Sequence, residues 1–419
     1  MSIPPSDPGR TGPLGHLEIH LDRLRWNYLA LQKMLAKGAD CAAVVKADAY
    51  GIGAAEVAAE LYKANCRHFY AAHASEGAAV RAALNTLSCS AGEGCGEGVA
   101  LQKQSCGTSP SPSPLRGSLP SPAGQEREFS AQIYVLHGPF GMKAEEFVRS
   151  NLIPVLNSRG DIEYWSGFAR KTGQRLPVVI QIDTGMNRLG VTADEVARLT
   201  ASPEILKPLD VRYLLSHLAC ADEPAHPKNK EQLEAFRRLT GQLGLPARLS
   251  FSNSAGIFLG ADYHFDQVRP GAALYGINPL SGAAPNQMQG IVTFKVRILQ
   301  IKDVDRGETV GYGASYQVST PAKLAILSVG YADGYMRSIT GDGMVYVRGH
   351  ACPVVGRVSM DLIAADVTAV APAPQAGEWA EIIGERQTVN DVAAATKLIG
   401  YEILTNLGRR YKRIYSGQG

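Results

Sequence analysis

The chain has 419 residues and a formal net charge of only +3, from 42 Lys and Arg against 39 Asp and Glu. Its basic residues are scattered, and no apolar run approaches the roughly 20 residues that cross a bilayer, which excludes a nucleic-acid surface and a membrane span. The seven cysteines include no Cys-x-x-Cys pair, so they predict reduced thiols of a cytoplasmic protein rather than a disulfide framework or a zinc site.

Two segments are predicted to be disordered. The first is a Pro- and Gly-rich tail, residues 1–15, which lacks the apolar core of a signal peptide. The second is an insertion at about residues 86–128, where Gly, Ser, Pro and Cys dominate and too little apolar surface is available to offset the ordering entropy. Between them, Leu17–His20 is a candidate strand that could join a second domain.

Short apolar runs alternate with helical patterns over residues 16–285. Candidate strands end near Lys46, Ala72, His137, Val155, Ile182, Ser216, Phe251 and Val268. Amphipathic helical patterns cover Glu56–Ala64, Asp161–Lys171 and Lys230–Leu243. Strand and helix repeated eight times over about 250 residues predict the α/β class, with a closed eight-stranded parallel (β/α)8 TIM-type barrel.

The pattern changes at about residue 286, and a mostly β domain is predicted for residues 286–419. Its candidate strands are Ile291–Lys302, Leu324–Val329, Met344–Val347, Cys352–Val355 and Leu362–Val367. One helix is expected at Asn390–Ile399, with Asn390 as its N-cap and Gly400 closing it.

The first candidate strand of the barrel ends on a lysine, Lys46, and is followed by a turn that carries Tyr50. A cation at the mouth of a buried strand is costly, and desolvation lowers the pKa of a lysine so that its amine can form a Schiff base. The alternative is that Lys46 extends its side chain to solvent.

Polar residues also follow four later strands, at Asp183–Arg188, His217, Ser252–Ser254 and Arg269–Gly271. In a barrel these strand ends converge on one face, where function gathers. Taken singly, Asp183 could cap a turn, His217 could be a core histidine, and Ser252–Ser254 could cap a helix. The serine segment and Gly271 also suit a phosphate, and a Schiff-base lysine facing a phosphate site indicates pyridoxal 5'-phosphate (PLP).

Four segments in order carry a resemblance to a known family. They are the lysine segment that ends at Gly53, Asp183–Gly190, Gly330–Tyr335 and Gly356–Asp361. Together they resemble the PLP-dependent alanine racemases. The resemblance implies a barrel followed by a β domain, and a head-to-tail homodimer in which the second domain of each subunit completes the other subunit's site.

The resemblance also implies roles for individual residues. Lys46 would hold PLP as an internal aldimine and act as one base, and Tyr312 from the other subunit would be the second base. The cofactor residues would be Tyr50, Ser254, Gly271 and Ala272 at the phosphate, Asn253 in the phosphate loop, Arg269 at the pyridine nitrogen and His217 against the ring. Arg188 and the backbone at Met360 would hold the substrate carboxylate, and Tyr331 would line the entrance.

The implied reaction is the interconversion of L- and D-alanine by two bases acting on a PLP external aldimine, an isomerase activity that supplies peptidoglycan or alanine catabolism. Two bases on opposite faces can remove a proton and return one with inverted configuration. Because Arg269 stays protonated, the ring should be a weaker electron sink, which disfavours transamination and an amino-acid decarboxylase. The alternatives are a broad-specificity amino-acid racemase and a non-catalytic PLP-binding barrel protein.

The sequence departs from the family pattern at two places. Many members carry a carbamylated lysine where this chain has Gln181, so we hypothesise that Gln181 substitutes by hydrogen bonding, with an anion such as chloride near Arg188 and Arg337. The phosphate-contacting tyrosine near the end of the chain has no clear counterpart. Arg409 is the candidate for its place, with Tyr411 close by.

Overall fold

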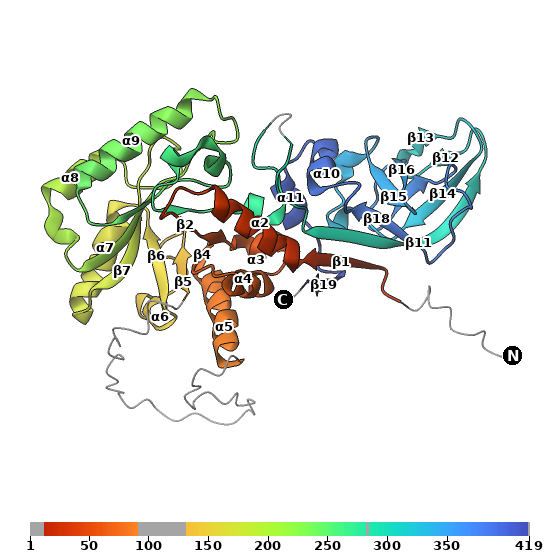
Figure 1. The fold of residues 1–419 in the computed structure, drawn as a ribbon. Helices are drawn as coiled ribbons and strands as arrows, with labels where there is room; N and C mark the ends of the chain where they lie inside the picture. The colour runs from red at the N-terminus through yellow and green to blue at the C-terminus, as the bar shows by residue number, and fades with distance from the viewer. Residues whose placement is uncertain (1–11, 91–130, 282–284, 418–419) are drawn as a thin grey trace, which may run out of the picture.

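The computed structural model describes residues 12–90, 131–281 and 285–417, which form a barrel and a second, mostly β unit (Figure 1). The barrel strands are β2 (Asp40–Cys41), β3 (Ala43–Val44), β4 (His68–Ala71), β5 (Gln132–Val135), β6 (Leu152–Leu156), β7 (Leu176–Gln181), β8 (Leu209–Leu215), β9 (Arg248–Ser250) and β10 (Gln267–Val268). They pair in the order β2-β10-β9-β8-β7-β6-β5-β4-β3. Only Ala42 separates β2 from β3, so the sheet closes into the predicted eight-stranded barrel.

Helices cover the outside of the barrel (Figure 1). They are α2 (Leu21–Met34), α4 (Ala54–Lys63), α5 (Ala74–Ser90), α6 (Ala144–Arg149), α7 (Arg159–Thr172), α8 (Ala193–Ala201) and α9 (Pro227–Leu243). The short segment α3 (Lys46–Gly51) instead follows the carboxyl end of β3. Their ends follow local chemistry: in α7, Ser158 Oγ accepts from Asp161 N–H and Gly173 closes the helix in the left-handed region. After β9 and β10 the chain forms only 3-10 turns, η2 (Ala255–Leu259), η3 (Ala261–Tyr263) and η4 (Ala272–Tyr275).

The predicted start of the insertion is wrong by several residues. Helix α5 continues through Ser90, whereas disorder was expected from about residue 86. The Ala-rich helix continues past Thr86, whose hydroxyl donates to the backbone carbonyls of Ala82 and Ala83. The Gly-rich part of the sequence begins only after Ser90. The predicted tail is also wrong at its end, because Gly15 already pairs in a strand with Val296. The remainder of the predicted insertion, and residues 1–11 of the predicted tail, lie outside the described residues.

The second unit is built on a mostly antiparallel sheet. Its strands are β1 (Gly15–His20), β11 (Val292–Val304), β14 (Ala322–Leu327), β15 (Met344–Val347), β16 (His350–Val355), β17 (Ile363–Asp366), β18 (Trp379–Ile383) and β19 (Lys412–Ser416). The expected strand at Leu17–His20 is confirmed: β1 pairs antiparallel with β11 and parallel with β19. A separate hairpin joins β12 (Thr309–Val310) to β13 (Tyr316–Gln317). Strand β18 was not predicted, and β1 and β19 bring the two ends of the described chain together.

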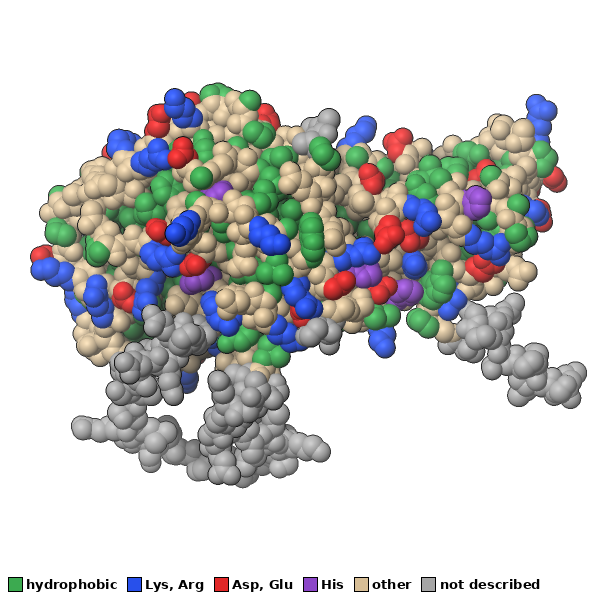
Figure 2. All heavy atoms as spheres, in the orientation of Figure 1, with side chains coloured by type: hydrophobic (Ala, Val, Ile, Leu, Met, Phe, Trp, Pro, Cys, Tyr) green, Lys and Arg blue, Asp and Glu red, His purple; other side chains and the backbone are tan. Residues whose placement is uncertain are grey.

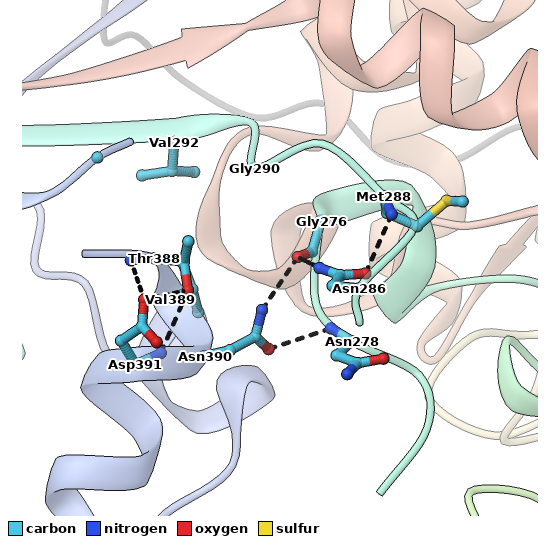
Figure 3. Close-up of a pocket in the computed structure, with 11 residues that line it drawn as sticks. Gly276, Asn278, Asn286, Met288, Gly290, Val292, Thr388, Val389, Asn390 and Asp391 are labelled. Atoms are coloured by element: carbon cyan, nitrogen blue, oxygen red, sulfur yellow. Dashed lines mark hydrogen bonds between the residues drawn. The ribbon is translucent and has the colours of Figure 1, made fainter. Parts of the chain in front are cut away.

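The expected caps of the helix near residue 390 are wrong. Helix α10 (Val389–Thr396) is capped by Thr388, whose side chain exchanges hydrogen bonds with Asp391, and Gly400 begins the next helix, α11 (Gly400–Thr405). Asn390 instead joins the two units. Its Oδ1 accepts from Asn278 N–H over 3.1 Å and its Nδ2 donates to Gly276 O over 3.3 Å (Figure 3). The pocket beside this contact, about 310 Å³, contains none of the predicted site residues.

Charges of both signs are interspersed over the face seen in Figure 2. Within residues 12–90, 131–281 and 285–417, no helix is long and apolar enough to cross a membrane. The described cysteines Cys41, Cys66, Cys220 and Cys352 are free thiols. The same part of the chain gathers no cluster of three or more His, Cys, Asp or Glu side chains that could hold a metal ion.

Candidate functional site

The barrel brings the predicted polar residues to one face. Lys46 lies two residues after the end of β3 and Arg188 in the loop after β7. His217 follows β8, Ser254 follows β9 and Arg269 follows β10. Their charges act on one another, since Arg269, Arg188 and Lys46 all lower the pKa of His217. The carboxyl ends of these strands therefore form a cationic mouth that suits an anionic ligand.

Lys46 is held where its amine loses part of its hydration. Burial is the main cause that lowers the pKa of Lys46, Arg188 adds to it, and Glu76 opposes it. The four residues after it, Ala47 to Tyr50, run through a left-handed turn with φ between 51° and 59°. Such a backbone costs about 1–2 kcal/mol per residue. Glu76 supports this turn, because its Oε1 accepts from Ala47 N–H over 2.9 Å.

A second feature is a cradle of hydroxyls and backbone N–H groups. Ser254 Oγ accepts from Gly271 N–H over 2.9 Å and from Ala273 N–H over 3.2 Å. A Cβ added at Gly271 would lie 2.3 Å from the hydroxyl oxygen of Tyr50, so only glycine fits there. Asn253 shapes the same loop, since its Oδ1 accepts from Gly256 N–H over 2.9 Å. Ser254 forms no capping hydrogen bond with the following turn, so within Ser252–Ser254 the expected capping contact is made by Asn253.

Arg269 is a buried cation held by neutral groups. Its guanidinium donates to Ser250 Oγ and to Ser216 O, each over 2.5 Å. Burial lowers the pKa of Arg269 to about 10 and, with help from Arg269, lowers the pKa of His217 to about 3. His217 is therefore neutral near neutral pH. Its side chain is half-buried at the mouth.

The loop that carries Arg188 is held by hydrogen bonds on both sides of that residue. Asp183 Oδ1 accepts from the backbone N–H groups of Gly185, Met186 and Asn187, as the turn-capping alternative predicted. Gln181 is buried, and its Nε2 donates to Leu189 O over 2.8 Å. The amide thus supports the backbone beside Arg188 rather than the guanidinium. Arg188 itself is exposed in the single chain.

The glycine- and tyrosine-containing motifs of the second unit form one surface. A Cβ on Gly311 would lie 3.3 Å from the backbone nitrogen of Arg357, and Tyr331 N–H donates to Ser359 O over 3.1 Å. Tyr312, in the β12–β13 turn, is 70% exposed, and Met360 is 51% exposed. Two large side chains of these motifs are therefore exposed to solvent in the single chain.

One chain does not unite the two groups of site residues. Figure 1 places α3, which begins at Lys46, in the barrel half, and the β12–β13 hairpin that carries Tyr312 toward the end of the second unit remote from the barrel. Arg337, in the turn η7 (Arg337–Ile339), also belongs to the second unit.

The end of the chain contains a contact that sequence reasoning missed. The ring of Tyr401 lies 5.8 Å from that of Tyr50, which in turn lies 4.7 Å from the ring of Tyr275. Arg409 lines a cleft of about 480 Å³ with Ala47, Asp48 and Glu76, next to the lysine turn. Tyr411 points elsewhere, since its hydroxyl donates to Ser328 O in the second unit. No periodicity or motif in the sequence singles out Tyr401.

Comparisons with known proteins cover nearly the whole chain. The family model "Alanine racemase, N-terminal domain" matches residues 19–279, and "Alanine racemase, C-terminal domain" matches residues 291–415. "Alanine racemase, catabolic" of Agrobacterium fabrum is 39% identical over 409 residues, which is 97% of this chain and 94% of the relative. "Alanine racemase" of Rickettsia canadensis is 38% identical over 401 residues, 96% and 98% of the two chains.

Solved structures show the same likeness. The alanine racemase of Bartonella henselae, described with covalently bound pyridoxal phosphate, is 38% identical with a TM-score of 0.81, and the match covers 96% of this chain and 100% of that one. The alanine racemase of Streptomyces coelicolor A3(2) is 30% identical with a TM-score of 0.81, and covers 96% and 98%.

Proposed function

The chain belongs to the alanine racemase family, and from that premise we propose that Lys46 of one subunit and Tyr312 of the partner subunit exchange the α-proton of alanine. The protein is a PLP-dependent alanine racemase, an isomerase. The two enantiomers have equal free energies in water, so the same reaction can supply D-alanine to peptidoglycan or consume it in alanine catabolism.

The residues at the barrel mouth fit PLP. The cradle of Ser254, Gly271 and Tyr50 leaves space that a Cβ would fill, and the hydroxyls of Ser254 and Tyr50 are donors for a phosphate. Ala272 lies between the two cradle N–H groups, and Asn253 holds the loop. These residues would hold the phosphate, with Lys46 bonded to the aldehyde carbon.

His217 would contact the ring of the cofactor, and the guanidinium of Arg269 would face its pyridine nitrogen. A neutral His217 offers a flat apolar surface, and Arg269 offers donors that cannot lose their proton near neutral pH. When bound, PLP stabilises negative charge at the substrate Cα. A protonated Arg269 keeps that stabilisation modest, because it hinders protonation of the ring nitrogen.

Lys46 and Tyr312 would serve opposite faces of the substrate. The lowered pKa of Lys46 increases the share of neutral amine, which can accept a proton at Nζ. On the other face, the hydroxyl oxygen of Tyr312 would give up or accept the second proton. Because Tyr312 is exposed and remote from Lys46 in one chain, we propose a head-to-tail homodimer with shared sites.

Substrate recognition follows from charge. Arg188 would pair with the alanine carboxylate, helped by the backbone at Met360, and Tyr331 would line the entrance. Support comes from the pinned loop that presents Arg188 and from the hydrogen bond that joins Ala332 N–H to Met360 O over 3.1 Å. A cytoplasmic location is part of the proposal and is supported by the free thiols of the described cysteines.

The observation that best supports this function is that Lys46, whose pKa is lowered, lies on the same face of the barrel as the cradle of Ser254 and Gly271. Purified protein should show a visible absorption band that borohydride abolishes, and should convert L-alanine to an equal mixture of enantiomers. Lys46→Ala should lose both properties, whereas the surface variant Lys207→Ala should keep them. Undiminished racemisation by Lys46→Ala would contradict the proposal. A visible band without D-alanine would favour a PLP-binding protein, and comparable rates with serine would favour a broad-specificity racemase.

A further inference from the structure

The interior of the barrel beneath Arg269 is polar. Ser250, Gln267, Tyr70 and Tyr134 are all fully buried there, each at 0% exposure. Barrel interiors are mostly filled with branched apolar side chains. A buried polar group is costly unless it is hydrogen-bonded, so a polar layer in this position needs a reason other than packing.

The donor and the acceptor of each hydrogen bond in this layer are fixed by chemistry. The Arg269 guanidinium can only donate, so Ser250 Oγ, 2.5 Å away, must accept. The Ser250 hydroxyl then donates to the backbone carbonyl oxygen of Gln267 over 2.9 Å. From the other side, the hydroxyl of Tyr70 donates to Gln267 Oε1 over 2.6 Å. The ring of Tyr70 also lies 5.9 Å from the guanidinium carbon of Arg269.

Stability alone does not account for Gln267. Its Nε2 is buried and has no hydrogen-bond partner within the described parts of the chain. An unsatisfied buried donor is costly, and an apolar side chain of the same shape would avoid that cost. What the Gln267 side chain supplies is one oxygen, Oε1, which accepts from Tyr70 over 2.6 Å and lies 3.5 Å from Ser250 Oγ. Ser250 Oγ in turn accepts from Arg269.

We infer that Gln267 and Tyr70 are positioning residues that hold Ser250 Oγ, and through it the plane of the Arg269 guanidinium, toward the ring of the cofactor. This inference rests on the proposed placement of Arg269 at the ring nitrogen. A guanidinium that tilts away would no longer suppress protonation of that nitrogen. The ring would then be a stronger electron sink, and part of the alanine would lose its amino group to the cofactor. That side reaction balances without an outside reagent, since alanine is oxidised to pyruvate as the cofactor aldehyde is reduced to an amine.

The test uses the full-length, PLP-loaded protein and the variants Tyr70→Phe and Gln267→Met. Both keep the approximate size of the side chain and remove the hydrogen bond between Tyr70 and Gln267 Oε1. Gln267→Met leaves the bond from Ser250 to the backbone oxygen of residue 267 in place. The visible spectrum of the resting protein is recorded across neutral and alkaline pH, and pyruvate released per racemisation event is measured with L-alanine. Both variants should have an altered spectrum and about a 5-fold higher pyruvate ratio, the change expected from the loss of one buried hydrogen bond.

Tyr134→Phe is the matched control. It also removes a buried phenol hydroxyl, and its ring stacks 4.6 Å from that of Tyr70. Its hydroxyl, however, donates to Gln132 Oε1 over 2.7 Å and has no bond to Gln267. The spectrum and the pyruvate ratio of this variant should match those of the wild type.

A further variant, Arg269→Lys, separates two failures. If Arg269→Lys alters the spectrum while Tyr70→Phe and Gln267→Met resemble Tyr134→Phe, the positioning role is wrong and the proposed function stands. If Arg269→Lys also leaves the spectrum unchanged, Arg269 does not face the ring, and the placement of the cofactor and the positioning role are both wrong.

Discussion

Gln181 Nε2 donates to the backbone carbonyl oxygen of Leu189 over 2.8 Å, and this bond fixes the chain immediately beside Arg188. The support comes from a neutral amide and is applied to the backbone. Across the described ranges no carboxylate forms an ion pair with Arg188, so its charge is available to a substrate carboxylate. A charged support at position 181 would compete for the guanidinium, whereas glutamine does not.

Gln181→Ala should weaken alanine binding without loss of the cofactor. The Arg188 loop would lose one of its two anchors, and a lost buried hydrogen bond of about 1 kcal/mol corresponds to about a 5-fold rise in KM. Steady-state kinetics together with the visible spectrum test this. Gln387→Ala is the control, since Gln387 is a buried glutamine that holds Met344 O and Ile382 O in the second unit. An unchanged KM with Gln181→Ala would show that Asp183 alone holds the loop.

Gly271→Ala should lower PLP affinity. The new Cβ would lie 2.3 Å from the Tyr50 hydroxyl oxygen, and overpacking of this kind costs about 1–3 kcal/mol. Fluorescence titration of the apo-protein with PLP measures the loss. Tyr50→Phe added to Gly271→Ala removes the clashing oxygen and should restore folding stability. Gly241→Ala, where an added Cβ meets no atom within 4 Å, should bind PLP like the wild type. Wild-type affinity of Gly271→Ala would contradict the cradle.

The polar face of the barrel was predictable because each of its residues lies close after the end of a predicted strand. Lys46, His217 and Arg269 stand where hydrophobic strands stop, and parallel strands in a barrel end on one face. The order of the four motifs along the chain then indicated the alanine racemase family. Each of these signals is local in the sequence. The (β/α)8 pattern predicts that the strand ends, and so the polar residues that follow them, lie on the same face of the barrel.

Other features were not predictable because they depend on contacts distant in sequence. The left-handed turn after Lys46 contains no glycine between Ala47 and Tyr50, so the local sequence does not predict it. The turn is stabilised by Glu76, which belongs to helix α5. Tyr401 reaches Tyr50 only because α11 packs against α3. Asn390 was expected to be a cap from its residue type, but Thr388 forms the capping box and frees Asn390 to join the two units.

Acid should destabilise the protein through His68. Burial lowers the pKa of His68 to about 4 from its ordinary value of 6.5, although Asp40 opposes the shift and Arg248 reinforces it. Between these values the unfolded chain binds the proton and the folded one does not. The contribution of neutral His68 to the free energy of unfolding is therefore complete above pH 6.5. It falls by about 2–3 kcal/mol as the pH is lowered toward 4.

Urea unfolding at a series of pH values measures this loss. His68→Gln should show a shallower fall of the midpoint below pH 6.5 than the wild type. His217 acts in the same direction in both proteins and so does not affect the comparison. His350→Gln, at an exposed position of β16, should follow the wild type at every pH. Equal slopes for His68→Gln and the wild type would show that His68 is charged in the folded protein.

Mixing two inactive variants tests whether the site is shared between subunits. Lys46→Ala lacks one base and Tyr312→Phe lacks the other, so each homodimer should be inactive. If the bases come from different subunits, a hybrid dimer contains one site with both. Random exchange makes half of the dimers hybrids, each with one intact site of two, so activity should recover to about a quarter of the wild-type value.

The control for this recovery is a mixture of Lys46→Ala with the double variant Lys46→Ala/Tyr312→Phe. That mixture forms the same assemblies but contains no lysine base, so it should stay inactive. Hybrids that are seen by mass spectrometry of differently tagged subunits and yet show no recovery would place both bases in one chain. The remote position of the β12–β13 hairpin from α3 in Figure 1 argues against such an outcome, because the second unit would have to move as a whole to bring Tyr312 to Lys46.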